Sequence, residues 1–237
     1  MKRNVSADDA LYGDNGVHTS LWDAKAVLFD FDFTLADSSV GIIACINYGL
    51  TKLGLPEAPD DKIMKTIGLY IPEALVALAG EEYCPKGQEF FGYFTEKADE
   101  VMADGTDIFP AAETVIPTLA DCGLSVGIVS TKYRYRIESM MEDAGLLGYL
   151  DVIIGGEDVT RHKPAPDGLL IASEKLALDV EDCVYVGDSH VDAGAAQSAG
   201  MPFVAVLSGT TTARTFESYP STAVLPSIDS LVANEIW

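Results

Sequence analysis

Positive charge is scarce in this sequence. Only 15 Lys and Arg residues stand against 37 Asp and Glu residues, so the formal net charge is -22 at pH 7. A surface of that sign repels the phosphate backbone of nucleic acids and the headgroups of anionic membranes. We therefore expect no nucleic-acid partner and no membrane partner. The same field repels a phosphorylated ligand, so a site for such a ligand must carry concentrated local positive charge.

Long apolar runs and paired cysteines are also missing. No apolar stretch approaches the roughly 18 residues that a membrane helix needs. Residues 1–22 lack the apolar segment of a secretory signal, and we expect them to form an N-terminal extension. The four cysteines, Cys45, Cys84, Cys122 and Cys183, show neither a CxxC pair nor nearby histidines. This spacing indicates neither a zinc site nor a disulfide framework, and a cytoplasmic location suits it.

Short apolar runs rich in strand-forming residues predict a buried parallel sheet. These runs span 26–31, 125–129, 152–154, 183–186 and 203–207. Helical patterns alternate with them, at 112–120, 136–144, 167–176 and 192–199. Strands that alternate with helices imply right-handed crossovers and helices on both faces of the sheet. The sequence therefore predicts an α/β fold with a doubly wound, Rossmann-like parallel sheet.

One interval, residues 38–107, breaks this rhythm because it contains helical patterns and no convincing strand. The helices are predicted at 39–53, 61–67, 72–79 and 87–102. We interpret the interval as a helical cap domain inserted after the first strand, with Asp37 or Ser38 capping its first helix. The Rossmann-like core then comprises residues 23–37 and 108–237.

Polar side chains follow several of the predicted strands, at the point where each strand ends. Open parallel sheets bind their ligands outside the carboxyl ends of the strands. The segments there are Asp30-Phe31-Asp32-Phe33-Thr34, Ser130-Thr131-Lys132, Arg161-His162-Lys163-Pro164 and Gly187-Asp188-Ser189-His190-Val191-Asp192. Carboxylates, hydroxyls and a lysine should thus meet in one crevice.

The carboxylates in these segments suit phosphate chemistry. Proteins usually hold Mg²⁺ with a small set of oxygen ligands. The side chains of Asp30, Asp32 and Asp188, together with a backbone carbonyl beside Asp30 and Asp32, offer such a set. The metal would neutralise like charges, so that Asp30 can attack phosphorus as a nucleophile. Asp32 would protonate the leaving oxygen and then deprotonate the hydrolytic water.

Hydroxyl and ammonium groups complete the predicted site. Ser130, with Thr131 beside it, is the candidate for binding phosphoryl oxygens, and Lys163 supplies a positive charge over the transferring group. Mg²⁺ and Lys163 would be the local positive charge that the acidic surface requires. The expected partner is a small phosphorylated substrate, bound by a monomer or a homodimer.

The order and spacing of these segments resemble the four motifs of the haloacid dehalogenase-like (HAD) hydrolase superfamily, across about residues 26–207. Leu35-Ala36-Asp37-Ser38 and Lys163-Pro164-Ala165-Pro166-Asp167, with a helical C1-type cap, resemble its phosphoglycolate-phosphatase-like branch. With the predicted strands numbered along the chain, the resemblance implies the sheet order 5-4-1-2-3.

The resemblance also implies roles for individual residues. Asp30 is expected to be the nucleophile, and Asp32 the general acid and base. The implied metal ligands are the Asp30 carboxylate, the Asp32 carbonyl and Asp188, with Asp192 as a supporting acid behind them. The activity implied is Mg²⁺-dependent hydrolysis of a small phosphomonoester, such as a phosphoglycolate-like compound or a sugar phosphate, through an aspartyl-phosphate intermediate.

Several other activities stay open. Dehalogenating members lack the second aspartate of the first motif, so the presence of Asp32 disfavours dehalogenation. Gly187 and Asp192 favour hydrolysis over sugar phosphomutase activity, which remains an alternative. A pyrophosphatase and a non-catalytic sensor of phosphorylated metabolites are the others. Phe33 stands where glycine is commonest, and we expect its ring to face the cap and narrow the substrate pocket.

Two further segments carry a weaker signal. Gly68-Leu69-Tyr70, with Lys65 nearby, lies where related enzymes place a substrate-specificity loop, although ordinary packing at a helix end explains it equally well. For Lys132, Arg134 and Arg136 a solvated helix face is the simpler interpretation, and binding of a second anionic group is the alternative.

Overall fold

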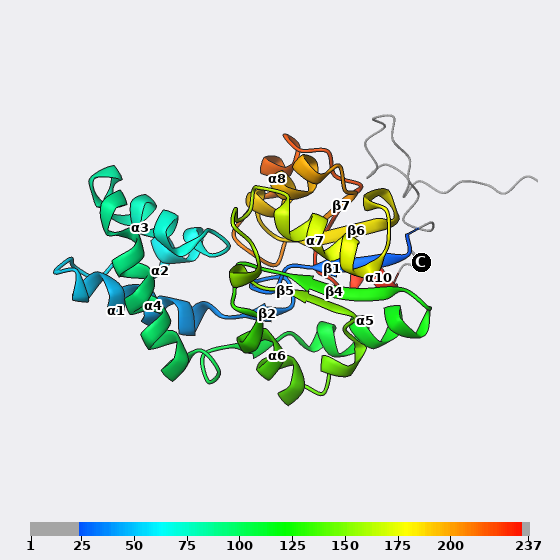
Figure 1. Cartoon of the computed structure of the whole chain (residues 1–237), viewed down its shortest axis with the longest axis horizontal. Coiled ribbons are helices and arrows are strands. Elements are labelled where there is room, and N and C mark those ends of the chain that lie inside the picture. The colour runs from blue at the N-terminus through cyan, green and yellow to red at the C-terminus, as the bar shows by residue number, and fades with distance from the viewer. Residues whose placement is uncertain (1–23, 234–237) are drawn as a thin grey trace, which may run out of the picture.

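The computed structural model describes residues 24–233, so the predicted N-terminal extension lies outside the described residues. Figure 1 shows a sheet flanked by helices, with a separate group of helices beside the end at which the first strand finishes. Within residues 24–233, no helix is both long and apolar enough to cross a membrane.

The sheet contains six parallel strands in the order β5-β4-β1-β6-β7-β8. Their bounds are β1 Ala26–Phe29, β4 Ser125–Val129, β5 Val152–Ile154, β6 Cys183–Gly187, β7 Phe203–Val206 and β8 Ala223–Leu225. The doubly wound fold is confirmed, and the five predicted strands take the implied order. The sequence does not predict β8, because this edge strand is very short and its central Val224 is exposed.

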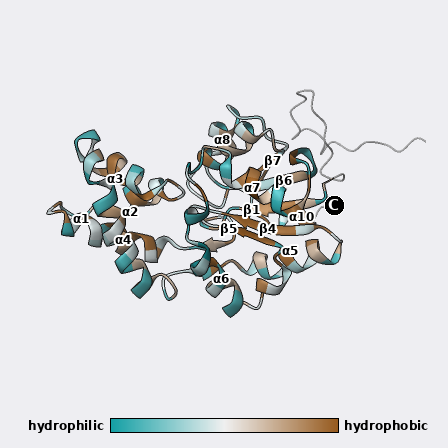
Figure 2. Cartoon of the chain, in the orientation of Figure 1, coloured by the Kyte–Doolittle hydropathy of each residue, from teal (hydrophilic) through white to brown (hydrophobic). Residues whose placement is uncertain are grey.

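Helices cover both faces of the sheet (Figure 1). One face carries α5 Pro110–Asp121, α6 Arg134–Asp143 and α10 Ser230–Ala233, and the other carries α7 Asp167–Leu176, α8 His190–Ala199 and α9 Ala213–Phe216. The 3₁₀ turns are η3 Met64–Thr66, η4 Glu81–Lys86, η5 Leu147–Tyr149, η6 Gly156–Asp158 and η7 Val180–Asp182. Figure 2 shows why the strands lie inside: they are apolar throughout, whereas the helices carry polar residues on their outer sides.

The cap consists of four helices that lie between two halves of a small ribbon. They are α1 Ser39–Lys52, α2 Asp60–Ile63, α3 Ile71–Ala79 and α4 Gly87–Val101. The ribbon pairs β2 Ala36–Asp37 with β3 Asp107–Ile108, antiparallel, and lies at the boundaries predicted for the cap. Ser38 holds the N-cap position of the first helix but makes no side-chain capping bond, and Asp37 Oδ1 instead accepts a hydrogen bond from the Ser39 amide at 2.9 Å.

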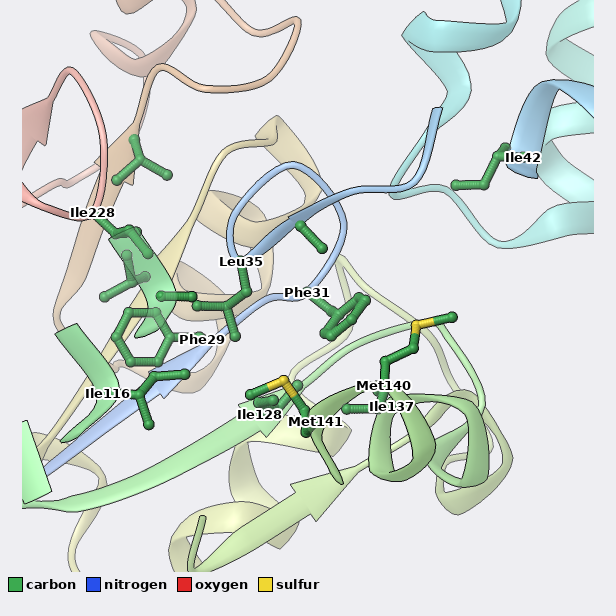
Figure 3. Packing of buried hydrophobic residues seen from close by; sticks show 14 of the residues in the cluster. Phe29, Phe31, Leu35, Ile42, Ile116, Ile128, Ile137, Met140, Met141 and Ile228 are labelled. Carbon is green, nitrogen blue, oxygen red and sulfur yellow. The ribbon is translucent and has the colours of Figure 1, made fainter. Parts of the chain in front are cut away.

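Two apolar clusters hold the core together, one on each face of the sheet. Alternate residues of β1 point to opposite faces: Val27 and Phe29 join the larger cluster, and Ala26 and Leu28 join the other. Figure 3 shows the larger cluster, which extends past the loop after β1 to Ile42 in the cap. Cap and core are therefore packed through continuous apolar contacts beside the ends of the strands.

Truncation of Phe29 tests this packing. Phe29 is fully buried, so Phe29→Ala should lower the free energy of unfolding by about 3–5 kcal/mol. The control is Val40→Ala, because Val40 is 69% exposed on α1 and its truncation should change that free energy by less than about 0.5 kcal/mol. Urea unfolding measures both values. Equal losses of unfolding free energy in the two variants would contradict the conclusion that Phe29 stabilises the central sheet by its packing.

Candidate active site

The buried contact between Asp30 and Lys163 forms the centre of the site. Asp30 follows β1 and Lys163 lies in the loop before α7, and both side chains are almost fully buried. Lys163 Nζ lies 2.8 Å from Asp30 Oδ1 and 2.6 Å from Asp192 Oδ1. Asp30, Lys163 and Asp192 were all predicted from the sequence. The fold brings them together around one ammonium group, from the end of β1, the loop before α7 and the start of α8 after β6.

Both carboxylate oxygens of Asp192 accept hydrogen bonds from neighbouring groups of the protein. Oδ1 accepts from Lys163 Nζ and from the hydroxyl of Tyr185, and Oδ2 accepts from the amide of Ser189 at 3.0 Å and its hydroxyl at 2.5 Å. Oxygens with these partners are poorly placed to bind a metal. This arrangement suits the supporting role expected for Asp192 at the start of α8.

Asp30 and Asp188 offer oxygens with fewer partners. Ligand oxygens of Asp30, Asp188 and Asp192 all lie within 4.8 Å of one another. Thr34 Oγ1 donates a hydrogen bond to Asp188 Oδ1 at 3.2 Å. With the oxygens of Asp192 already bonded, Asp30 and Asp188 are the carboxylates best placed to hold a cation.

The charge balance of the buried centre fits a divalent cation. Among the described residues, the buried charged groups here are Asp30, Asp32, Asp188 and Asp192 with Lys132 and Lys163, and the buried Arg136 next to them is balanced by its ion pair with Asp99. Negative charge therefore exceeds positive charge by two, and uncompensated buried charge is unfavourable. Two carboxylates with free oxygens are the hard ligands that Mg²⁺ accepts. The residues present fit the metal that the sequence predicts.

The electrostatic crowding perturbs several pKa values in the metal-free centre. Burial raises the pKa of Asp30 to about 7, with Lys163 opposing the shift and Asp192 adding to it. Burial and the charge of Asp192 also raise the pKa of Asp188 well above its usual value. Burial alone would lower the pKa of Lys163, but the carboxylates of Asp192 and Asp30 outweigh it, and the lysine stays charged.

Asp32 faces a cavity between core and cap. Apolar side chains form most of the cap wall, among them Ile42, Ile67, Phe91 and Phe94. The cavity volume is about 50 Å³, roughly enough for three or four ordered waters. The enclosed volume therefore suits a short chemical group next to Asp32.

The loop Gly68-Leu69-Tyr70 lines this cavity, whereas Lys65 is not among the lining residues. The ring of Tyr70 stacks on His162 of the core, with ring centroids 3.9 Å apart and an interplanar angle of 16°. Burial lowers the pKa of His162, so the stacked imidazole is neutral at neutral pH. The sequence left two interpretations open for this loop. The loop thus contacts the core at His162, one residue before Lys163.

Lys132 and Arg136 are buried, so the interpretation of a solvated helix face is wrong for these two residues. Lys132 Nζ lies 3.0 Å from Asp32 Oδ1. Arg136 Nη2 donates to Asp99 Oδ1 of α4 at 2.6 Å and to the carbonyl of Thr95 at 3.2 Å. The sequence shows only that they follow a strand, and their partners lie on segments far away along the chain.

Three further residues were predicted to bind the substrate: Ser130, Thr131 and Phe33. Of these, Thr131 lines the cap cavity, whereas Ser130 and Phe33 do not. Thr131 and Ser130 also line a smaller hollow beside Lys163. Phe33 is buried with a φ of 61°, and its carbonyl accepts from the hydroxyl of Ser208 at 2.5 Å. Phe33 is not among the residues that line either hollow, so the expectation that its ring narrows the pocket is not supported.

A model of the haloacid dehalogenase-like hydrolase family matches residues 27–206. The chain belongs to this family. A curated phosphoglycolate phosphatase of Yersinia pseudotuberculosis is 32% identical over 192 residues, which cover 78% of this chain and 82% of the relative. That of Salmonella typhi is 31% identical over 210 residues, which cover 80% and 83%. These relatives confirm the predicted phosphoglycolate-phosphatase-like branch, and the protein is a HAD-like phosphatase.

A solved structure supports the same assignment. A haloacid dehalogenase-like hydrolase from Bacteroides fragilis matches with a TM-score of 0.85 and 41% sequence identity, over 88% of this chain and 100% of the other. The likeness covers both the Rossmann-like core and the cap, because little of either chain falls outside it.

Sequence reasoning about this phosphatase missed three supporting residues. Tyr185 is fully buried on β6, and its hydroxyl lies 3.1 Å from Lys163 Nζ and 2.8 Å from the carbonyl of Val129. Thr34 belongs to the first motif, where its contact with Asp188 could have been suspected from its place in the segment. Gly209 follows β7, and a side chain at this position would overlap Asp188 Oδ2.

The close approach of Gly209 to Asp188 leads to a prediction for this phosphatase. The methyl group of Gly209→Ala should push the Asp188 carboxylate out of place and weaken Mg²⁺ binding by about 10-fold to 100-fold. Titration calorimetry with Mg²⁺ measures the affinity. The control is Gly148→Ala, because a methyl group there meets no atom within 4 Å. Unchanged Mg²⁺ affinity in Gly209→Ala would show that Asp188 does not bind the metal.

The raised pKa of Asp30 predicts a pH dependence of the metal-free phosphatase. Because the folded pKa of about 7 exceeds the ordinary value of 3.8, the folded state binds this proton more tightly than the unfolded state. The stability from Asp30 is present below pH 3.8 and is lost as the pH rises towards 7. Asp30→Asn should therefore raise the Tm of the metal-free protein at pH 8 and change it little at pH 4.

Thermal unfolding in a chelator measures this difference across pH 4–8. The control is Asp167→Asn, because the hydrogen bond from Arg161 lowers the pKa of that carboxyl and its loss should destabilise the protein at neutral pH instead. If Asp30→Asn raises the Tm equally at pH 4 and pH 8, then Asp30 does not carry an uncompensated buried charge at pH 8.

Proposed function

We propose that this phosphatase hydrolyses a small phosphomonoester with Mg²⁺, through an aspartyl-phosphate intermediate on Asp30. The observation that carries the proposal is the buried carboxylate of Asp30, held 2.8 Å from Lys163 Nζ beside Asp188. This group is close to a cavity that opens onto Asp32 and is covered by the cap. Asp30 is thus a candidate nucleophile beside a cation and a candidate metal-binding carboxylate, and it lies two residues before the candidate acid Asp32, which lines the cavity.

Mg²⁺ would be held by the carboxylates of Asp30 and Asp188 and by the carbonyl of Asp32. When bound, it would neutralise the excess negative charge and polarise the phosphoryl group. Lys163 would add its charge to the oxygens of the same phosphoryl group, with Ser130 and Thr131 donating hydrogen bonds. Closure of the cap would keep bulk water away from the reacting atoms.

The first half-reaction transfers the phosphoryl group to Asp30. A carboxylate oxygen of Asp30 forms a bond to phosphorus as the bond from phosphorus to the leaving oxygen breaks. Asp32 gives its proton to that oxygen, so the alcohol leaves neutral. In the second half-reaction Asp32 takes a proton from water, the water oxygen bonds to phosphorus, and inorganic phosphate leaves Asp30 as a free carboxylate.

The cavity volume favours a short leaving group. The cavity volume of about 50 Å³ leaves room for a few ordered waters, which suits a short leaving group better than a hexose. This favours a phosphoglycolate-like substrate over a sugar phosphate, and hydrolysis over the sugar phosphomutase alternative. The relatives from Yersinia and Salmonella, which bear the name phosphoglycolate phosphatase, make phosphoglycolate the first compound to test.

Release of inorganic phosphate from a panel of compounds tests the proposal. The panel comprises phosphoglycolate, small neutral phosphomonoesters, hexose phosphates, nucleotides and pyrophosphate, each with Mg²⁺ and with chelator. We expect the highest kcat/KM for short phosphomonoesters, with no release after chelation. Asp30→Asn should lower kcat at least about a thousandfold.

Asp182→Asn is the matched control. Asp182 ends η7 just before β6, at the opposite end of that strand from Asp188, and pairs with Lys25. Its replacement should leave kcat unchanged. Full turnover by Asp30→Asn would disprove the nucleophile assignment, and the absence of release from every compound by the folded, Mg²⁺-loaded protein would favour the sensor alternative.

A further inference from the structure

Lys132 is a buried cation that the proposed reaction does not use. It lies between β4 and α6, its side chain is 4% exposed, and it lines the cavity together with Asp32. Its ammonium group has three N–H donors. Among residues 24–233, the one carboxylate within ion-pair distance is Asp32, at 3.0 Å, and the Phe31 ring lies 5.5 Å away. Donors of Lys132 are therefore left for an acceptor inside the cavity.

Arg136, the other cation that lines the cavity, already has hydrogen-bond partners. Arg136 donates to Asp99 through Nε and Nη2 and to the carbonyl of Thr95. Asp99 also accepts from the hydroxyl of Tyr135 at 2.5 Å. The guanidinium group is thus bound to the cap helix α4. Lys132 is left as the cation that can turn towards a ligand without breaking a bond between cap and core.

Position determines which ligand atom Lys132 can meet. In the proposed reaction Asp32 hands its proton to the leaving oxygen, so that oxygen must lie within hydrogen-bond reach of Asp32. Lys132 Nζ is 3.0 Å from the same carboxylate. An acceptor separated from the leaving oxygen by one carbon atom or two can therefore reach Lys132. The surrounding wall is largely apolar, which strengthens the attraction between an anion and an ammonium group.

We infer that Lys132 recognises a carboxylate on the leaving group, so that the preferred substrates are phosphate esters of short 2-hydroxy carboxylates. This inference rests on the proposed function. In the substrate complex Lys132 bridges Asp32 and the substrate carboxylate, which selects the acidic leaving group and holds the acid and base against it. A neutral leaving group of the same length fills the cavity but leaves the donors of Lys132 without an acceptor.

A pair of matched substrates tests the inference. Phosphoglycolate and 2-hydroxyethyl phosphate have leaving groups of nearly the same size, and only the first carries a carboxylate. The wild type should prefer phosphoglycolate in kcat/KM. Lys132→Met should lose about 10-fold to 100-fold more with phosphoglycolate than with 2-hydroxyethyl phosphate, since a hydrogen bond to a charged group contributes about that much. Lys132→Arg should recover part of the preference.

Arg134→Met is the control variant. Arg134 lies two residues further on, outside the cavity lining, where it pairs with Asp158 at 3.1 Å. Loss of this positive charge should leave the ratio of the two kcat/KM values unchanged. Equal losses with both substrates in Lys132→Met would show that Lys132 only positions Asp32, and would overturn the carboxylate assignment. A wild-type preference for 2-hydroxyethyl phosphate would overturn it as well.

A binding measurement covers the case in which Lys132→Met does not fold, because it leaves Asp32 buried without its partner. Asp32→Asn removes that carboxylate and leaves the Lys132 ammonium to pair with the substrate, whereas the double variant Asp32→Asn/Lys132→Met removes both charges. Calorimetry with Mg²⁺ and each substrate measures the affinities of these two variants. Asp32→Asn should bind phosphoglycolate at least about 10-fold more tightly than 2-hydroxyethyl phosphate, and the double variant should lose this difference. An unchanged difference would overturn the inference.

The outcome for the proposed function is separate. If the wild type releases phosphate from neither compound nor from the rest of the panel, hydrolysis itself is disproved. If it releases phosphate from both and the ratio does not depend on Lys132, hydrolysis stands and the role of Lys132 as the carboxylate-binding residue is disproved.

Discussion

Lys163 makes the contact on which the rest of the site depends. Its ammonium group lies 2.8 Å from Asp30 and 2.6 Å from Asp192, and all three groups are buried. Removal of one partner from a buried ion pair leaves an uncompensated charge, which is strongly destabilising. Without Lys163, the carboxylates at the ends of β1 and β6 would repel each other at the point where the sheet should hold them together. The loop that carries Lys163 is therefore as important to the geometry as the strands are.

The surrounding contacts restrict the position of this lysine from several sides. The hydroxyl of Tyr185 lies against Lys163 Nζ, Asp192 Oδ1 and the carbonyl of Val129, and so links β4, β6 and the lysine loop. One residue before Lys163, His162 stacks on Tyr70 of the cap. The position of the cap is thus coupled physically to the loop that supplies the central cation, and the contacts of Arg136 with α4 fix the cap at a second point.

Much of the fold and the main chemistry can be predicted from the sequence because their signals are local. The apolar strands, the helical interval before Asp107 and the aspartates that follow β1 and β6 each depend on neighbouring residues in the chain. For Lys132 the sequence leaves two interpretations open, because its partner Asp32 belongs to another strand end and the sequence around it is that of an ordinary helix start. Tyr185 escapes prediction because a tyrosine within an apolar strand usually signals packing, and its hydroxyl contacts become visible only in three dimensions. Gly209 lies in a loop without a motif, and only the approach of Asp188 explains why a side chain is excluded there.

The acidity of the whole chain and the two buried lysines of the site act over different distances. A net charge of -22 opposes the approach of any anion, but at physiological salt this repulsion is screened over about 8 Å. Lys163 and Lys132 are buried, and screening of buried pairs is much weaker. In the proposed reaction an anionic substrate would gain little attraction until it enters the cavity, where Lys132 lines the wall and Lys163 lies beside Asp30. Its affinity and selectivity would then arise from contacts at short range, and the cap that covers the cavity would contribute to recognition as well as to the exclusion of water.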